Sequence, residues 1–201
     1  MSSSAIDRYV AFGDTTRGGD CAASLRAGFA WARAQEGLDV PARSTRANDP
    51  EELERALLRI AQRGRLGSGD LWHVEIHGSG PSAWGLWFDG LVFAPQRVLA
   101  EPLGLAPGLA LVGSCWAATA SAMEALAWIL APGTPVIACE KKAYTDDLTT
   151  RVFPALDAAD VLNRGAPPPA SQRWLELDKA LRKVPEKKRF PWRLLQVPEA
   201  R

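Results

Sequence analysis

The sequence predicts an α/β protein with a mostly parallel sheet that is covered by helices on both faces. Two observations lead to this fold class: short apolar runs recur along the chain, and segments with helical spacing of apolar residues separate them. A chain of 201 residues, of which 47% are hydrophobic and 23% charged, is typical of one globular domain. We therefore assign residues 1–201 to a single domain, in which about 166–201 form a helical and basic C-terminal extension.

The first half of the chain alternates strands and helices. Residues 8–13 are an apolar run closed by Gly-Asp and predict the first strand, and residues 40–44 predict a weaker second strand. A helix is expected over residues 20–36, because an aspartate opens it and its apolar residues have helical spacing. Asp49-Pro50 is typical of the start of a second helix. Its expected buried face consists of Leu53, Ala56, Leu57 and Ile60.

The second half contains the remaining strands. Residues 71–76 predict the third strand, which ends in a glycine-rich loop, and Asp89-Gly90 marks the turn of a hairpin over residues 84–93. Residues 109–112 and 135–139 predict the fourth and fifth strands. The expected helices cover residues 95–99, an alanine-rich stretch from Cys115 to about Leu130, and residues 145–162 and 171–181, followed by a polar tail.

His77 and Cys115 occupy corresponding places in this pattern. Each follows a predicted strand and lies beside small residues. Functional residues of parallel α/β folds lie at the carboxyl ends of strands, so both would share one edge of the sheet if their strands are neighbours. A cysteine nucleophile needs an imidazole for proton transfer, and a single cysteine with a distant histidine is a known pattern in enzymes. We predict that Cys115 is the nucleophile and His77 its proton-transfer partner.

Two backbone amides are expected to complete this site. A thiol at the start of a helix is favoured as thiolate by the helix dipole, and the N–H of Cys115 would lack a helical partner. Gly78 has no side chain and can bring its N–H close to a substrate carbonyl. The amides of Gly78 and Cys115 are therefore the predicted oxyanion hole. Cys21 and Cys139 are weaker candidates for the nucleophile, since neither lies in a glycine-flanked Ser-Cys turn.

The order of these motifs resembles the CHAT domain, a caspase-like peptidase family related to caspases and separase. The resemblance rests on a strand followed by His77-Gly78, the Asp89-Gly90 hairpin, a strand followed by Ser114-Cys115, the Pro-Gly-Thr-Pro-Val-Ile-Ala-Cys stretch, and Asp146-Asp147. It covers roughly residues 68 to 165, about half of the chain.

The resemblance implies a caspase-like three-layer sandwich and cysteine endopeptidase activity. It assigns His77 and Cys115 as the catalytic dyad and the amides of Gly78 and Cys115 as the oxyanion hole. It also implies a protein or peptide substrate, and a role in bacterial defence or regulated cell death beside a separate sensor or activator protein. This chemistry needs no metal or organic cofactor.

The cleavage preference is not implied by the resemblance, because the segment from Cys139 to Tyr144 departs from the apolar, tryptophan-containing stretch of the family. Asp146 or Asp147 would favour a basic substrate residue, whereas Lys141 or Lys142 would favour an acidic one. Trp84 and Trp87 lie on opposite faces of a predicted strand, and one of them is expected to border the substrate groove. The candidate substrate-binding residues are Trp84, Cys139, Lys141, Asp146 and Asp147.

Two other classes of function stay open. His73, Glu75 and His77 alternate along a predicted strand and so face the same side, where they form a ligand set suited to zinc and to a metal-dependent hydrolase. Alternatively, the chain is a non-catalytic interaction module with a caspase-like fold. An intact histidine and cysteine argue against that module, and faster labelling of Cys115 than of Cys21 or Cys139 by a thiol-directed peptidase probe would discriminate.

Composition excludes several further classes. A formal net charge of +1 does not suggest a nucleic-acid binder, although basic residues gather towards the C-terminus. Three cysteines without close spacing predict neither a disulfide framework nor a structural zinc site. No apolar run is long enough for a membrane span and no secretory signal is visible, so we expect a cytoplasmic protein with reduced thiols.

Overall fold

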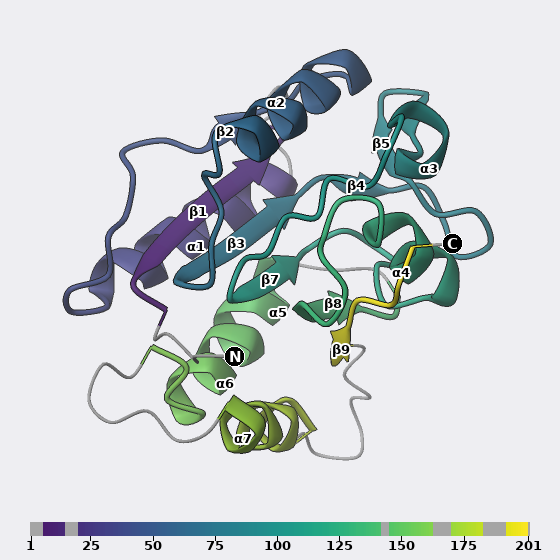
Figure 1. Ribbon diagram of the computed structural model, residues 1–201. Coiled ribbons are helices and arrows are strands. Elements are labelled where there is room, and N and C mark those ends of the chain that lie inside the picture. Colours follow the sequence, from purple (N-terminus) through teal and green to yellow (C-terminus); the bar gives the residue numbers. More distant parts are fainter. Residues whose placement is uncertain (1–5, 15–19, 142–144, 163–169, 183–191, 201) are drawn as a thin grey trace.

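A six-stranded sheet forms the centre of the computed structural model, which describes residues 6–14, 20–141, 145–162, 170–182 and 192–200 (Figure 1). Its strand order is β2-β1-β3-β7-β8-β9. These strands are β1 (Arg8–Gly13), β2 (Thr45–Arg46), β3 (Asp70–Glu75), β7 (Leu109–Val112), β8 (Pro135–Cys139) and β9 (Trp192–Gln196). Every pair is parallel except β8 with β9.

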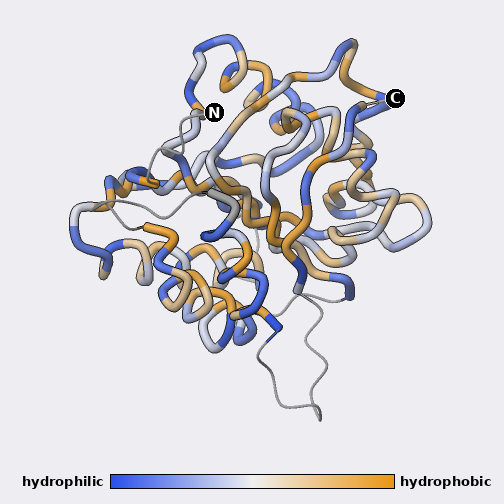
Figure 2. Tube along the Cα trace, turned by 60° about the horizontal axis from the view of Figure 1, so that its bottom comes forward, coloured by the Kyte–Doolittle hydropathy of each residue, from blue (hydrophilic) through white to orange (hydrophobic). Residues whose placement is uncertain are grey.

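Helices cover both faces of this sheet, because successive residues of each central strand point to opposite sides. One face packs against α1 (Asp20–Ala34), the π-helical turn η1 (Leu148–Val152), α6 (Phe153–Ala158) and α7 (Ala170–Arg182). The short helix α5 (Thr145–Asp147) leads into η1. The other face packs against α2 (Pro50–Gln62) and α4 (Ala120–Leu126). Figure 2 shows hydrophobic segments through the centre of the molecule and hydrophilic ones mostly at its periphery. The predicted α/β class with a mostly parallel, doubly covered sheet is confirmed.

Helix α2 shows how local sequence fixes an element. The side chain of Asp49 accepts a hydrogen bond from the amide of Glu52 at 2.7 Å, and Pro50 occupies the first turn, where its missing N–H has no consequence. The predicted face is buried against the sheet: Leu53, Ala56, Leu57 and Ile60. Among the described residues, no helix is both long and apolar enough to cross a bilayer.

A second, smaller sheet follows β3 and consists of β4 (His77–Gly78), β5 (Leu86–Phe88) and β6 (Leu91–Phe93). The turn between β5 and β6 has φ of 44° at Asp89 and 95° at Gly90, as in two-residue hairpin turns. The predicted hairpin is therefore confirmed, and the short helix after it is α3 (Pro95–Val98). The expectation of a glycine-rich loop at residues 77–80 is wrong at its start, because His77 and Gly78 pair with β5.

Two predicted elements have other bounds in the structure. The alanine-rich helix was expected from Cys115 to about Leu130, but α4 has seven residues and starts only at Ala120. The second strand lies at Thr45–Arg46 and not at residues 40–44. These two residues pair with Phe12 and Gly13 at the end of β1.

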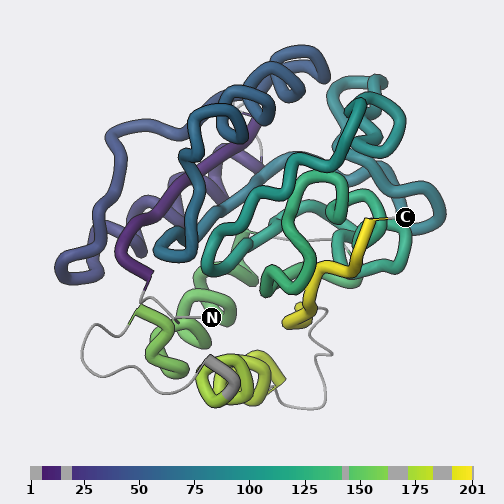
Figure 3. The backbone as a smooth tube through the Cα atoms, in the orientation of Figure 1, coloured from purple at the N-terminus to yellow at the C-terminus, as the bar shows by residue number. Residues whose placement is uncertain are grey.

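The chain after α7 was expected to be a polar tail, yet residues 192–196 form the edge strand β9. It pairs antiparallel with β8, so that Trp192 lies opposite Cys139 and is 2% exposed. Arg193 Nε donates to Glu140 Oε1 at 2.8 Å across the same pair. The C-terminal segment thus runs beside the green β8 segment in Figure 3 and becomes part of the central sheet.

Candidate active site

Strands β3 and β7 are parallel neighbours, so His77 and Cys115 lie at the same carboxyl edge of the sheet. The hydroxyl of Ser114 donates a hydrogen bond to the carbonyl of Ile76. This bond joins the residue before Cys115 to the residue before His77. The structure therefore contains the strand adjacency on which the predicted pair depends.

Cys115 lies in a sharp turn after β7 and is half-buried. Trp116 has φ of 63°, a left-handed conformation that is strained for a bulky residue. Its amide donates to the carbonyl of Lys141 at 2.8 Å, and its carbonyl accepts from the amide of Thr119 at 3.1 Å. Because this turn separates Cys115 from α4, the prediction that Cys115 sits in the first turn of a long helix is wrong. No backbone carbonyl of the described residues accepts a hydrogen bond from the Cys115 amide.

Gly78 lies in direct contact with the backbone of Cys115. A Cβ atom at position 78 would be 2.0 Å from the Cys115 carbonyl oxygen and 2.9 Å from Nε1 of Trp84. That indole N–H donates to the same carbonyl at 2.9 Å. The amide of Ser79 bonds the carbonyl of Gly85 at 3.0 Å, so the alternation of an antiparallel pair turns the Gly78 N–H away from β5. The two amides predicted for an oxyanion hole thus belong to adjoining residues.

The imidazole of His77 is half-buried and packs edge-on against the ring of Trp87, with 5.9 Å between the ring centroids. Among the described residues, no hydrogen bond joins this imidazole to a carboxylate or to the thiol of Cys115. Hydrogen bonds of catalytic pairs in ligand-free proteins often form only when substrate is bound. The aromatic contact with Trp87 therefore contributes to the orientation of His77 in the structure.

The other two thiols are less suited to attack a substrate. Burial raises the pKa of Cys139 to about 12, and burial followed by the charge of Glu75 raises the pKa of Cys21. Both remain protonated thiols at neutral pH, and a thiol is a far weaker nucleophile than a thiolate. Cys115 is thus the one cysteine that combines partial exposure with a position at the strand edge.

The predicted substrate-binding residues divide into two groups. Trp84 is 1% exposed and its indole N–H donates to the Cys115 carbonyl, while Cys139 is fully buried, so neither side chain presents a surface to a substrate. Lys141 and Asp146 are exposed, while Asp147 is half-buried, with its carboxylate 3.8 Å from Arg151 Nε. Burial raises the pKa of the Asp147 carboxyl. Lys142 lies outside the described residues.

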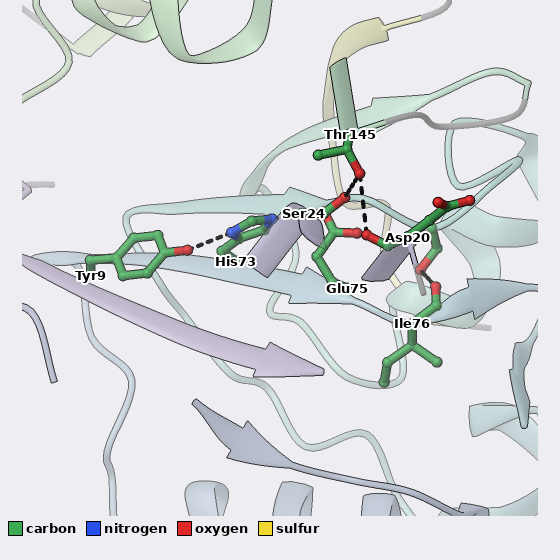
Figure 4. Close-up of polar contacts among 8 residues, drawn as sticks. Tyr9, Asp20, Ser24, His73, Glu75, Ile76 and Thr145 are labelled. Carbon is green, nitrogen blue, oxygen red and sulfur yellow. Dashed lines mark hydrogen bonds and ion pairs between the residues drawn. The ribbon is translucent and has the colours of Figure 1, made fainter. Parts of the chain in front are cut away.

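The segment that carries these acidic residues is held against the start of α1. Thr145 Oγ1 lies 3.0 Å from Ser24 Oγ and donates to the carbonyl of Asp20 at 3.2 Å (Figure 4). The candidate substrate-binding residues included Trp84 but not Trp87, although Trp87 is the tryptophan that contacts His77. Its place could have been found by counting back from the Asp89-Gly90 turn, which fixes the register of the hairpin.

A buried polar network lies beneath this edge of the sheet (Figure 4). The Tyr9 hydroxyl is 2.5 Å from Nδ1 of His73, and Nε2 of His73 is 2.8 Å from Oε1 of Glu75. Burial raises the pKa of Tyr9, which therefore keeps its proton and can donate it to Nδ1, while Nε2–H donates to Glu75. A Cβ on Gly113 would lie 1.8 Å from Oε1 of Glu75, so the network extends to the end of β7.

This network argues against the metal-hydrolase alternative. Both ring nitrogens of His73 are engaged by Tyr9 and Glu75 inside the core, so His73 and Glu75 do not present free ligands beside His77. In the part of the chain that the structure describes, no group of three His, Cys, Asp or Glu side chains could hold a metal ion. The common orientation of His73 and Glu75 is confirmed by the hydrogen bond between them, whereas His77, the third residue of the predicted set, lies outside β3, in strand β4 of the second sheet.

Tyr9→Phe is expected to destabilise the protein by about 1–3 kcal/mol, because it leaves Nδ1 of His73 buried without its partner. Urea unfolding measures this change. Thr149→Ala, which deletes an exposed hydroxyl that donates to the Asp146 carbonyl, is the control and is expected to change stability by less than about 0.5 kcal/mol. Equal stability of Tyr9→Phe and the wild type would contradict a role for the network.

Comparison with known proteins finds similarity at the level of structure. No protein-family model matches the sequence, and no curated protein matches it. The fold is similar to the X-ray structure of a secreted C11 cysteine protease from Bacteroides thetaiotaomicron in complex with an irreversible peptide inhibitor, with a TM-score of 0.46 and 11% sequence identity. The match covers 86% of this chain and 58% of that protease, so the chain spans less than two thirds of its length.

Proposed function

We propose that this protein is a cysteine endopeptidase of the caspase-like type, with Cys115 as nucleophile and His77 as proton-transfer residue. The observation that carries the proposal is the meeting of His77-Gly78 with Cys115 at the carboxyl ends of the adjacent strands β3 and β7. A half-buried thiol, a half-buried imidazole and two available amides at one sheet edge are the components that acyl transfer requires.

The first step is attack of the Cys115 thiolate on a peptide carbonyl. The S–C bond forms, and the amides of Gly78 and Cys115 bind the oxygen that becomes negatively charged. The C–N bond then breaks while protonated His77 gives a proton to the leaving nitrogen. The products of this step are a free amine and a thioester between Cys115 and the acyl part of the substrate.

The second step releases the acyl part. Neutral His77 takes a proton from water, whose oxygen attacks the thioester carbonyl. The new C–O bond replaces the S–C bond, and the same two amides bind the second oxyanion. The products are a carboxylic acid, the Cys115 thiolate and protonated His77. Every group in this cycle belongs to the chain, the substrate or water.

The resemblance to the CHAT domain supports a narrower proposal. It suggests a cytoplasmic protease that acts on a protein substrate in a bacterial defence or cell-death system, together with a separate sensor or activator protein. The order of His77-Gly78, the hairpin and Ser114-Cys115 supports this assignment at the level of motifs.

Digestion of a diverse peptide library, read by mass spectrometry, tests the proposed activity. The wild type is expected to cut internal peptide bonds, and the residue before each cut reports whether Lys141 or Asp146 selects the substrate. A peptidyl electrophile applied in parallel at about pH 7.5 is expected to modify Cys115. Cys139 should remain unmodified, since a pKa of about 12 leaves less than about one thiolate in ten thousand.

Modification of the three cysteines at similar rates would contradict the assigned nucleophile. In the folded protein Cys115 should react fastest, and equal rates are expected only after denaturation. An absence of both cleavage and probe adduct, with and without added cell extract, would favour the non-catalytic interaction module. The two readouts test different requirements, since the probe needs only a reactive Cys115 and the library needs the full cycle.

A further inference from the structure

Exposed apolar side chains gather on the hairpin next to His77. Among the described residues, the large hydrophobic side chains that remain exposed are Trp87, Leu91, Val92, Val98 and Leu175. All but Leu175 lie between positions 87 and 98, in β5, β6 and α3. Trp87 is 38% exposed and Val92 is 47% exposed. Apolar surface concentrated beside a candidate active site indicates a binding surface more often than scattered exposed residues do.

The register of the small sheet arranges part of this surface in a row. His77 lies directly opposite Trp87, and Trp87 lies directly opposite Val92. Residues opposite each other on neighbouring strands have side chains on the same face. Leu86 and Phe93, on the other face, are 3% and 0% exposed and pack into the core. The hairpin thus buries one face and presents His77, Trp87 and Val92 on the other.

The chemistry of the proposed reaction decides which part of a substrate this row would meet. His77 gives its proton to the leaving nitrogen, so the residue after the scissile bond lies beside the imidazole when the bond breaks. Trp87 contacts that imidazole with 5.9 Å between centroids, and Val92 adjoins Trp87. A side chain that extends from the leaving nitrogen along the face of the sheet would cover Trp87 first and Val92 second.

We propose that Trp87 and Val92 form a binding subsite for an apolar side chain on the residue immediately after the scissile bond. This inference rests on the proposed peptidase activity and adds to it a substrate class, namely peptides with an aliphatic or aromatic residue at that position. The same contact would bury the exposed face of Trp87 and hold the imidazole in place while the nitrogen is protonated.

Two peptides that differ only in the residue after the cut provide the test, with the preceding sequence taken from a library hit. One carries leucine and the other serine at that position. The wild type is expected to cleave the leucine peptide with a kcat/KM about tenfold higher. Trp87→Ala is expected to reduce this ratio to about twofold or less, and Trp87→Phe to retain most of it.

The informative quantity is the ratio of kcat/KM between the leucine and serine peptides. Trp87→Ala also disturbs His77 and slows cleavage of both peptides, but an effect common to both cancels in the ratio. Leu175→Ala removes an exposed leucine on α7 and is the matched control, for which the wild-type ratio is expected. A wild type that cleaves both peptides equally, or a Trp87→Ala protein that keeps the tenfold ratio, would overturn the subsite.

Two further outcomes separate this inference from its premise. If Trp87→Ala changes the oligomeric state in size-exclusion chromatography but not the ratio, a second copy of the chain covers the row and the subsite is wrong. If neither peptide is cut by the wild type and a peptidyl electrophile that ends at the reactive carbon does not modify Cys115, the peptidase proposal fails, and the subsite fails with it. Modification of Cys115 together with equal cleavage rejects the subsite alone.

Discussion

Cys115→Ala is expected to lower kcat/KM for a library-derived peptide by at least about a thousandfold, without loss of the fold. The substitution removes the atom that forms the thioester, and no other described thiol can replace it. Cys139 is fully buried with a raised pKa, and the pKa of Cys21 is raised as well. Water would have to attack the peptide directly, aided only by the two amides and by His77.

The controls for this prediction are Cys139→Ala and Cys21→Ala. Both are expected to retain activity within about threefold of the wild type, although removal of a buried sulfur at position 139 should reduce stability by about 1 kcal/mol. Thermal unfolding of all three variants shows whether lost activity reflects chemistry or folding. Full activity in Cys115→Ala would reject the nucleophile, and equal losses in the three variants would show that the cysteines act through structure.

Gly78→Ala is expected to reduce kcat by about a hundredfold or more. The added Cβ would lie 2.0 Å from the carbonyl oxygen of Cys115, and the clash involves backbone, which cannot rotate away. The chain must separate Gly78 from Cys115, and this movement carries the Gly78 N–H out of the oxyanion position. KM should change less than kcat, because the amide acts on the charge that develops only in the transition state.

Gly67→Ala provides the matched control for this substitution. A Cβ at position 67 meets no atom within 4 Å, so activity should stay at the wild-type level and stability should be unchanged or slightly higher. Steady-state kinetics with one peptide compares the two variants. A folded Gly78→Ala protein with an unchanged kcat would show that the oxyanion is bound elsewhere.

The parts of the fold that follow from local sequence were predicted well. The run Leu109–Val112 is strand β7 with the predicted bounds, because four consecutive apolar residues closed by glycine suit a strand buried on both faces. Asp49 and Pro50 fixed the start of α2 in the same way. In each case the residues that decide the structure lie within a few positions of each other in the sequence.

The parts that depend on distant contacts were not predicted. Alanine favours helix at residues 117 and 118. The segment is nevertheless held in a turn, because the amides of Ala118 and Trp116 donate to the carbonyls of Cys139 and Lys141 at and just after the end of β8. Likewise, the strand register showed that His73 and Glu75 share a face, but their buried partner Tyr9 comes from β1, 64 residues before His73. Pairings of this kind follow from the sheet order, which local patterns do not specify.

During synthesis, strand β8 lacks its antiparallel neighbour until β9 has emerged from the ribosome. The delay is long, because Glu140 and its partner Arg193 are 53 positions apart. An uncovered edge strand is a template for pairing with other nascent chains. The turn after Cys115 is held by the carbonyl of Cys139, the last residue of β8, and by that of Lys141, two residues further along the chain. The sheet edge beside this turn therefore stays uncovered until residues 192–196 pair with β8, and we expect a chain that stops before position 192 to aggregate more readily than the full chain.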